Sequence, residues 1–597
     1  MKISIAKNAG FCMGVQRAVN IALDASNNTK EPLYTFGPLI HNPQVLEMLK
    51  NKGILSLQKI PEKGKGTVLI RAHGVPLNEH ELLEKVGFNV INATCPRVIS
   101  VQKIIKKHGK AGYETIIIGD RNHPEVKGLL GYVSKNGYTV SSLKEFKNLP
   151  KFEKAVVVAQ TTQDTSLFNQ IKKNTQNNYP KYKIFNTICD STEKRQKEVR
   201  EISEKNDVII VIGGKQSGNT RRLAQIAAST GKSCFHIENI SELDFKKISF
   251  KDSLAITAGA STPNWIINEA YGKIKTFFQK NNNLFYSFVL QTRDFLLKTN
   301  ILLSLGAGCL TYACSRMQGF EHNLPYVFLA MFYILSMQII NNLFTIKSDK
   351  YNNPKRAYFY EKNKKILRIC AGISGLGGLY ITFHLSIFSF FIFMAMSILG
   401  FSYNLKFFSF FKIKRRIKDI SGSKTIFIAG AWGIITSVLP FLLHQSSIFN
   451  FQFLNLKPQT LMDFISVSPF LLFSRQTLAM VSVFVFSTGL VFSRTIFFDI
   501  LEMQGNRITG KETLAILIGE KKSLKIIKQV LILIFLVCFL SASIGIIQKT
   551  GFVLAFLPVL MLFLIIYTEK NNLFSGMYLY FIIELHFIIA GIMAVIF

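Results

Sequence analysis

Long apolar runs fill the second half of this 597-residue chain, whereas short apolar strands alternate with polar helical segments in the first half. A run of about 20 apolar residues is long enough to cross the hydrocarbon core of a membrane as one helix. The alternation in the first half is instead typical of strand–helix units that build a parallel sheet. The sequence therefore predicts an α/β domain at residues 1–280, a linker with an interfacial helix at 281–299 and an all-α membrane domain at 300–597.

The apolar runs predict about nine transmembrane helices. Lys and Arg gather in alternate connecting segments, at 347–368, 406–424 and 507–528, and such segments usually stay in the cytoplasm. The amino terminus has no apolar stretch of signal-peptide length, which agrees with a cytoplasmic first half. We therefore expect an integral protein of the cytoplasmic membrane whose α/β domain lies in the cytoplasm. The expected spans lie near 300–317, 324–344, 366–381, 383–403, 425–444, 475–497, 526–547, 551–568 and 575–596.

Three cysteines divide the first half into similar thirds. Cys12, Cys95 and Cys189 each follow an expected strand and precede an expected helix, at spacings of 83 and 94 residues. Internal repetition of this kind predicts three similar lobes around a pseudo-threefold axis. We therefore expect a trilobed α/β fold that brings the three thiols to one central point. Two further sets of polar residues repeat in the same way, namely His41, His123 and Ser217, followed by His73, Thr161 and Ser261.

The meeting of three thiols predicts a metal centre. A cytoplasmic location keeps thiols reduced and available as ligands. Three protein ligands with a vacant fourth position fit either catalytic zinc or an iron–sulfur cluster with one open iron, and composition does not separate the two. Zinc would activate water for hydrolysis, whereas an exposed iron could hold a substrate hydroxyl and feed electrons into the adjacent bond.

The other polar residues at the strand ends predict a binding site for an anion. Helix amino termini converge on the carboxyl edge of a parallel sheet and present unpaired N–H groups there. The loop at 213–220, which contains Ser217, Gly218 and Asn219, is rich in glycine, so its backbone can come close to an anion. Ser261 lies in a second loop of this kind. The formal net charge of +35 favours diphosphates and acidic lipid headgroups as partners. Nucleic acid is excluded because no recognition motif accompanies the charge.

Short motifs in order along residues 1–275 resemble the 4-hydroxy-3-methylbut-2-enyl diphosphate reductase family, also called LytB-like. The resemblance implies that Cys12, Cys95 and Cys189 hold one 4Fe–4S cluster and that Glu125 and Thr161 deliver protons. It also implies that the diphosphate binds at His41, His73, His123, Ser217, Gly218, Asn219 and Ser261. At Gly218 the family commonly has a second Ser. The motifs are Gly10–Val15, His41-Asn42, Ala72–Val75, Ala93–Pro96, His123–Val126, Gln160–Thr162 and Thr257–Ser261.

The activity implied by this resemblance is a reductive dehydroxylation. It would convert (E)-4-hydroxy-3-methylbut-2-enyl diphosphate to isopentenyl and dimethylallyl diphosphate in the non-mevalonate isoprenoid pathway. The electrons would come from a donor such as ferredoxin or flavodoxin. The competing hypothesis for the whole chain is a zinc-dependent phosphoester hydrolase tethered to a membrane bundle.

The membrane half resembles the UbiA-type intramembrane prenyltransferases. The resemblance implies that Asp349, Asp499 and Glu502 hold Mg²⁺ and that Lys414, Arg415 and Arg416 lie near a prenyl diphosphate. Carboxylates three or four residues apart on a helix share one face and can hold magnesium together. Several acidic positions of the family are neutral here, at Asn342, Thr345 and Asn506. The half is therefore either a prenyltransferase acting on a lipid-phase acceptor or an inactive anchor or binding module.

Overall fold

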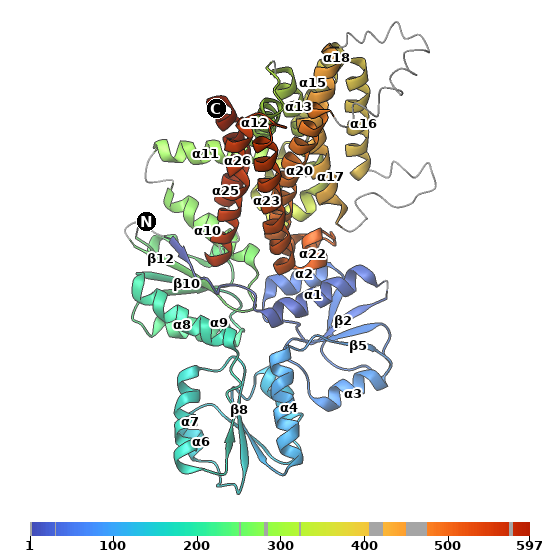
Figure 1. Cartoon of the computed structure of the whole chain (residues 1–597). Coiled ribbons are helices and arrows are strands. Elements are labelled where there is room, and N and C mark those ends of the chain that lie inside the picture. Colours follow the sequence, from blue (N-terminus) through green and yellow to red (C-terminus); the bar gives the residue numbers. More distant parts are fainter. Residues whose placement is uncertain are drawn as a thin grey trace. The chain divides into compact units, whose positions relative to one another are not determined.

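The computed structural model describes residues 3–29, 31–249, 252–279, 284–321, 324–404, 422–448, 474–571 and 577–597. Its chain forms two compact units, Met1–Asn283 and Leu284–Phe597, which Figure 1 colours from blue to green and from green to red. The first unit contains all the described strands, and the described part of the second unit is helical.

The first unit consists of three lobes, each built on a four-stranded parallel sheet. Numbered along each lobe, the strands have the spatial order 2-1-3-4 in all three sheets. The first sheet has the order β3 (Ile54–Leu57), β2 (Leu33–Phe36), β4 (Thr67–Ile70) and β5 (Asn89–Asn92). The second has β7 (Gly137–Val140), β6 (Glu114–Ile118), β8 (Ala155–Ala159) and β9 (Lys183–Ile184). The third has β11 (Ser233–Ile237), β10 (Val208–Ile212), β12 (Leu254–Ala258) and β1 (Ile3–Ile5).

The first strand of the chain completes the last lobe. β1 pairs in parallel with β12, with Ile3 opposite Leu254 and Ile5 opposite Ile256. Cys12 therefore follows the fourth strand of its sheet, as Cys95 follows β5 and Cys189 follows β9. The prediction of a trilobed pseudo-threefold α/β fold is confirmed. Because β1 belongs to the third sheet, the boundaries of the repeats in the sequence are shifted by one strand from the boundaries of the lobes.

Two central strands, β8 and β10, are apolar throughout because helices cover both faces of their sheets. β8 reads Ala-Val-Val-Val-Ala and β10 reads Val-Ile-Ile-Val-Ile, and every residue of both is buried. Continuous β-branched runs of this kind are typical of parallel sheets buried on both sides. The helices of this unit are α1 (Met13–Asn28), α2 (Pro43–Asn51), α3 (Leu77–Lys85), α4 (Pro96–Lys110), α5 (Pro124–Leu130), α6 (Leu143–Lys147), α7 (Thr165–Asn178), α8 (Asp190–Lys205), α9 (Gly218–Ala228) and α10 (Asn264–Gln279). Two 3₁₀ turns, Ile240–Glu242 and Phe245–Lys247, precede β12.

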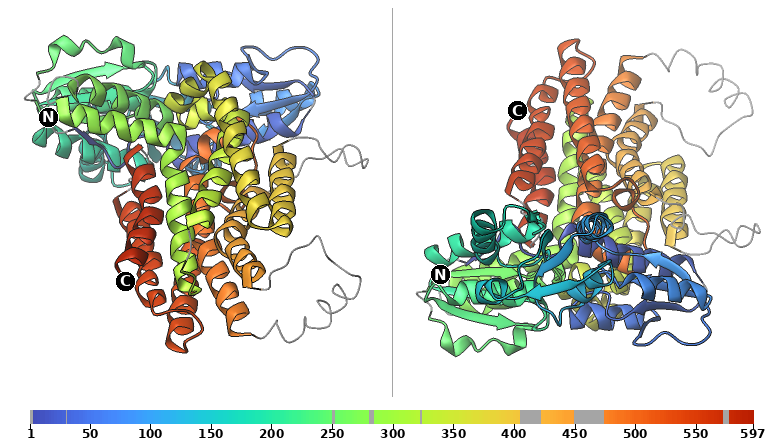
Figure 2. Two further views of the ribbon diagram at one scale, coloured as in Figure 1. Left: turned by 90° about the horizontal axis from the view of Figure 1, so that it is seen from above. Right: turned by 90° about the horizontal axis from the view of Figure 1, so that it is seen from below.

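The second unit is a bundle of long apolar helices, whose alignment Figure 2 shows from two directions. A π-helical turn, Ile434–Val438, joins α17 to α18. The helices are α11 (Leu284–Thr299), α12 (Ile301–Met317), α13 (Leu324–Asn352), α14 (Pro354–Lys362), α15 (Lys364–Leu385), α16 (Ile387–Asn404), α17 (Ser423–Gly433), α18 (Leu439–Ile448), α20 (Arg475–Leu501), α21 (Met503–Ile508), α22 (Leu514–Ile518), α23 (Glu520–Ser543), α24 (Thr550–Leu554), α25 (Phe556–Asn571) and α26 (Met577–Ile596).

Seven helices among the described residues are long and apolar enough to cross a membrane. An eighth span results when α11 and α12, which are bent by 74° at Asn300, are taken together. Each of the nine segments predicted from sequence coincides with helix over most of its described residues, but Ile387–Ser402 is shorter than a full span. The membrane-spanning helical domain is confirmed with seven or eight spans in the described ranges.

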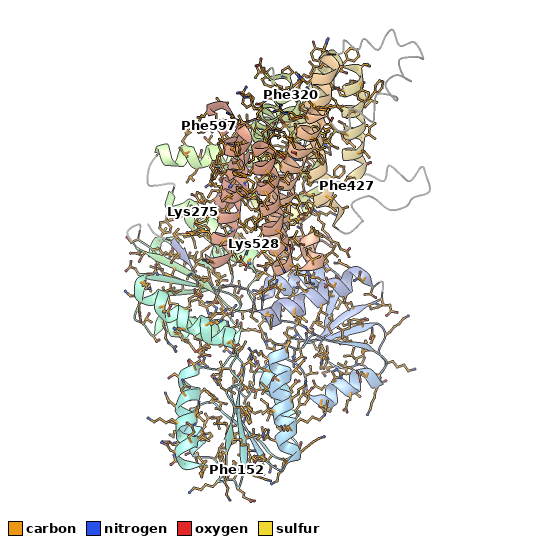
Figure 3. The ribbon with its side chains drawn as sticks, viewed as in Figure 1. Phe152, Lys275, Phe320, Phe427, Lys528 and Phe597 are labelled. Atoms are coloured by element: carbon orange, nitrogen blue, oxygen red, sulfur yellow. The ribbon has the colours of Figure 1, made fainter. Side chains whose placement is uncertain are left out.

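Large apolar side chains on the outside of the second unit are exposed rather than packed. Ile369, Phe427 and Phe563 are 61%, 46% and 72% exposed, and Figure 3 labels Phe427 on this unit. An exposed apolar surface of this extent is unfavourable in water but suits contact with lipid. The exposure therefore agrees with a unit that spans a membrane.

Candidate functional site

The three cysteines of the repeat line one cavity of about 80 Å³ in the first unit. Each is the residue that caps the amino end of a helix: Cys12 of α1, Cys95 of α4 and Cys189 of α8. The partial positive charge of a helix amino end favours a thiolate at that position. All three are free thiols, as the sequence predicts for metal ligands.

The backbone approaches Cys95 closely at Gly14. A Cβ atom on Gly14 would lie 2.4 Å from the Cys95 sulfur, which is far inside van der Waals contact. The Val15 N–H, one residue further along α1, points to the Cys12 sulfur at 3.5 Å. The first turn of α1 thus contacts two of the three thiols, and only glycine fits between them.

A buried arginine lies beside the cysteines. The Arg195 guanidinium donates hydrogen bonds to the carbonyl of Gly10 at 2.7 Å and to Ser191, so it ties the loop before Cys12 to the helix that follows Cys189. Its Nε atom is buried without a hydrogen-bond partner among the described residues. The sequence analysis missed Arg195, because an arginine in the second turn of a polar helix such as α8 is usually exposed.

Three histidines from two lobes meet at the same cavity. The ring centroids of His41, His73 and His123 lie 4.8 to 5.9 Å apart, and one nitrogen of each ring lies within 4.8 Å of the others. Burial lowers the pKa of all three, that of His123 to about 4. Nearby arginines lower all three pKa values further, and neighbouring imidazoles also lower those of His73 and His123. The imidazoles are therefore neutral at pH 7. His41 Nε2 and His73 Nδ1 are buried without partners in the described part of the chain.

Short polar side chains from the third lobe complete this end of the cavity. Ser217 caps α9, and the Ser261 hydroxyl donates to the His41 carbonyl at 3.0 Å. The Asn219 side-chain nitrogen is buried with no partner among the described residues, so it is a donor left for a ligand. A Cβ on Gly218 would lie 3.4 Å from His123 Nε2. A serine there would fit, and its absence leaves room beside His123.

Glu125 and Thr161 form a buried pair on the cavity wall. The Thr161 N–H and hydroxyl donate to the two carboxylate oxygens of Glu125, at 2.6 and 2.9 Å. Burial raises the pKa of Glu125 to about 7, although both hydrogen bonds from Thr161 act to lower it. Glu125 therefore holds a proton for about half the time near pH 7, as a general acid requires.

The cavity gathers the whole set predicted for the first unit, and it adds some residues. All twelve residues predicted for catalysis, anion binding and cluster ligation, Gly218 and Asn219 included, belong to its lining. Residues that the sequence analysis did not assign also line it: Arg97, Thr162, Ser191 and Thr192. Thr162 directly follows Thr161 and Ser191 lies two residues after Cys189, so closeness to the predicted residues was the available signal.

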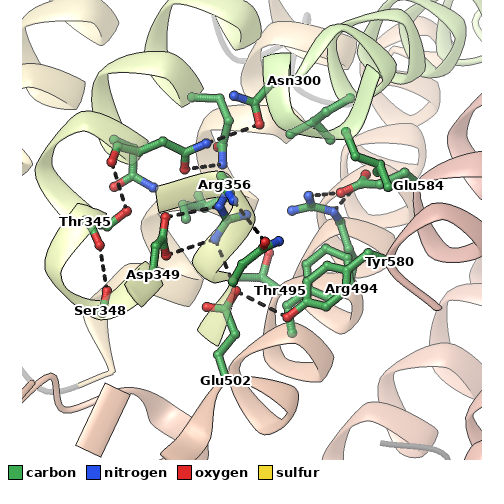
Figure 4. Close-up of a pocket in the computed structure, with 18 of the residues that line it drawn as sticks. Asn300, Thr345, Ser348, Asp349, Arg356, Arg494, Thr495, Glu502, Tyr580 and Glu584 are labelled. Atoms are coloured by element: carbon green, nitrogen blue, oxygen red, sulfur yellow. Dashed lines mark hydrogen bonds and ion pairs between the residues drawn. The ribbon is translucent and has the colours of Figure 1, made fainter. Parts of the chain in front are cut away.

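The second unit has its own polar cavity, of about 90 Å³. Asp349 on α13 and Glu502 between α20 and α21 line it (Figure 4). Asp499 is not part of the lining, but it is bonded to the lining residue Lys424. The predicted magnesium carboxylates thus come together around one site. Lys414, Arg415 and Arg416, predicted near a prenyl diphosphate, lie outside the described residues.

Comparisons with known proteins assign the two halves separately. The model of the family described as LytB protein matches residues 3–275, and that of the UbiA prenyltransferase family matches residues 301–572. A protein of Caldanaerobacter subterraneus named 4-hydroxy-3-methylbut-2-enyl diphosphate reductase is 42% identical over 287 residues, which are 47% of this chain and 100% of the relative.

Solved structures are similar to each half. One described as (E)-4-hydroxy-3-methyl-but-2-enyl diphosphate reductase is 40% identical, with 46% of this chain and 100% of that chain covered and a TM-score of 0.38. Another, of a digeranylgeranylglyceryl phosphate synthase, is 18% identical, with 51% and 98% covered and a TM-score of 0.31. The chain belongs to the LytB reductase family through residues 3–275 and carries a UbiA prenyltransferase family domain in residues 301–572.

Proposed function

We propose that the first unit reduces (E)-4-hydroxy-3-methylbut-2-enyl diphosphate to isopentenyl and dimethylallyl diphosphate. One observation carries the proposal: three free thiols, unpartnered buried donors and a proton-holding carboxyl share one cavity. The relatives named for this activity are matched over their full length or nearly so. The overall change replaces a C–O bond by C–H, takes up two electrons and two protons, and releases water.

The thiols fit an iron–sulfur cluster. Cys12, Cys95 and Cys189 cap three helices, and a buried guanidinium lies beside two of them, so an anionic group with three thiolate ligands would be compensated. We propose that they hold a 4Fe–4S cluster, which when bound supplies electrons one at a time and an iron position open to a ligand. A donor such as ferredoxin or flavodoxin would reduce it.

The histidine end of the cavity would hold the diphosphate. Its donors are the Ser217 and Ser261 hydroxyls, the Asn219 amide and the amino end of α9. His41, His73 and His123 are neutral before binding and gain protons as phosphate oxygens approach, because a nearby anion favours the charged imidazolium. Substrate binding would thus give the three imidazoles around the diphosphate a positive charge.

Glu125 would deliver the proton that lets the substrate hydroxyl leave as water. Its carboxyl faces the cavity that the cysteines line, and Thr161 fixes both oxygens. After proton transfer the same two hydrogen bonds stabilise the carboxylate.

The second unit makes the chain a membrane protein. We propose that the first unit lies on the cytoplasmic side, where the positively charged segments at 347–368 and 507–528 would also lie.

Prenyl transfer is the activity for which the family of the second unit is named, and it stays a prediction for this chain. The predicted Mg²⁺ ligands do not fit that ion in this structure, because basic side chains already occupy their oxygens. Asp349 accepts hydrogen bonds from Arg356 on both oxygens, and Asp499 accepts one from Lys424. We assign no step through Mg²⁺.

Glu125→Gln is expected to keep its iron and lose most of its turnover. An amide cannot give up a proton to the leaving oxygen, and positioned general acids contribute a rate factor on the order of 10² to 10⁴. The measurement is single-turnover reduction by the anaerobic full-length protein, with Glu201→Gln on the exposed face of α8 as the control. Near-normal reduction by Glu125→Gln would remove this residue from the mechanism.

Gly14→Ala is expected to lower the iron content of the purified chain. The new methyl group would force the Cys95 sulfur away from its place, and overpacking of this kind costs about 1–3 kcal/mol. Gly272→Ala is the matched control, since a Cβ on this helical glycine meets no atom within 4 Å. Equal iron per chain in the two variants would contradict the close packing of α1 against Cys95.

Binding of inorganic diphosphate to the first unit should strengthen as the pH falls from 8 to 6. The imidazole pKa values are depressed in the free cavity and rise on binding, so binding takes up protons, and each proton adds up to about tenfold in affinity per pH unit. Calorimetric titrations of the protein with diphosphate at several pH values measure this pH dependence of the affinity. His41→Gln should flatten the dependence relative to His80→Gln, which alters a partly exposed ring paired with Glu84 on α3. A parallel pH profile in the two variants would rule out His41 as a proton acceptor.

A further inference from the structure

The polar cavity of the second unit contains a guanidinium where a divalent cation would be expected. Arg356, on α14, donates to both oxygens of Asp349, from Nε at 3.0 Å and from Nη2 at 2.9 Å. The same Nη2 atom lies 3.5 Å from Glu502 Oε1. Figure 4 shows Arg356 between the two carboxylates. One fixed cation therefore bridges two of the three acidic residues predicted to hold magnesium.

The third acidic residue has its own cation. The Asp499 side chain is fully buried, and Lys424 donates to its Oδ1 at 2.8 Å while the Thr425 hydroxyl donates to its Oδ2 at 3.1 Å. On the other carboxylate, Glu502 Oε1 also accepts from the Tyr580 hydroxyl at 3.3 Å.

The charges of the cavity balance among the described residues. A further pair, Arg494 with Glu584, joins α20 to α26 at the same cavity through two hydrogen bonds, and Lys511 donates to the Ser348 hydroxyl at 2.6 Å. Buried charges in a membrane domain are unfavourable unless paired. The lining contains three acids, Asp349, Glu502 and Glu584, and four bases, Arg356, Lys424, Arg494 and Lys511. Asp499, which lies outside the lining and accepts from Lys424, is the fourth acid of the balance.

Magnesium does not fit this arrangement. Mg²⁺ takes oxygen ligands at about 2.0–2.1 Å in near-octahedral geometry and usually needs carboxylates free to turn toward it. Here Asp349 uses both oxygens on Arg356, and Asp499 uses both on Lys424 and Thr425. Asn342, Thr345 and Asn506, which stand at acidic positions of the resembled motifs, bring no charge. A divalent ion would add to cations that already neutralise the site.

We propose that this cavity works without a divalent cation, because Arg356 and Lys424 are permanent counter-charges to the carboxylates that would otherwise bind Mg²⁺. The consequence is that magnesium-assisted departure of a diphosphate does not occur at this site. Any ligand of the cavity meets a charge-balanced, amide-rich wall, to which Asn506 offers a buried side-chain nitrogen that has no partner in the described residues.

Counting bound Mn²⁺ in the full-length protein tests the proposal directly. Mn²⁺ substitutes for Mg²⁺ at oxygen sites and is read by electron paramagnetic resonance. The wild-type chain and Asp349→Asn should bind the same number of Mn²⁺ ions, since Asp349 is committed to Arg356. One more tight Mn²⁺ in the wild type than in Asp349→Asn, displaced by excess Mg²⁺, would overturn the proposal.

Removing the guanidinium gives the converse test. Arg356→Gln should gain about one Mn²⁺ per chain, because Asp349 and Glu502 lose their shared cation, and the gain should vanish in Arg356→Gln/Asp349→Asn. Lys350→Gln is the matched control, since Lys350 pairs with Glu361 on the surface near α14. A monodisperse Arg356→Gln protein that binds no additional Mn²⁺ would contradict the role of Arg356. Should Arg356→Gln fail to fold, the wild-type and Asp349→Asn pair still decides.

Discussion

Parallel strand–helix units place the carboxyl end of each strand next to the amino end of the helix that follows it, and the first unit uses this constraint three times around one cavity. In each lobe the fourth strand leads to a cysteine, the first to His41, His123 or Ser217, and the third to His73, Thr161 or Ser261. Residues up to about 250 positions apart in the sequence therefore become neighbours without any long loop. The helix amino ends bring positive potential to the same place, which suits thiolates and phosphate oxygens.

The chemistry of that cavity depends on groups kept away from water. Burial favours the uncharged form of Glu125 and of the three histidines alike: the carboxyl is favoured with its proton, and the imidazoles are favoured without a second proton. Both become useful when an anion arrives, because the imidazoles can then take protons while the carboxyl still has one to give. Arg195 provides a buried positive charge beside Cys12 and Cys189 that does not depend on a bound ligand.

In the second unit, pairing of acidic with basic side chains offsets the unfavourable desolvation of buried charges. Three ion pairs, Asp349 with Arg356, Asp499 with Lys424 and Glu584 with Arg494, place each acid against a basic side chain from another helix. In low dielectric such pairs hold firmly once formed, since removing one partner leaves an uncompensated charge. Basic side chains of the same unit thus neutralise the three carboxylates that the sequence predicts as magnesium ligands.

The sequence was sufficient for features that repeat and insufficient for contacts that do not. The spacing of Cys12, Cys95 and Cys189 predicted the three lobes, because a repeated strand–helix unit admits few arrangements. It did not reveal that β1 completes the third sheet, since a three-residue strand carries too little pattern. Arg195 and Arg356 were missed for a related reason, because each binds a partner outside its own helix. Arg195 donates to Gly10 in a distant loop. Arg356 donates to Asp349, seven residues earlier and on the preceding helix, which is beyond the three- and four-residue spacing of one helix face.

The account of the first unit depends most on what the three thiols hold. The decisive measurement is the iron, sulfide and zinc content of the full-length protein purified without oxygen, compared with a Cys95→Ser variant. We predict about four irons and four sulfides per chain with a brown colour, and their loss in the variant. A colourless wild-type protein with about one zinc per chain would contradict the reductive chemistry and favour hydrolysis.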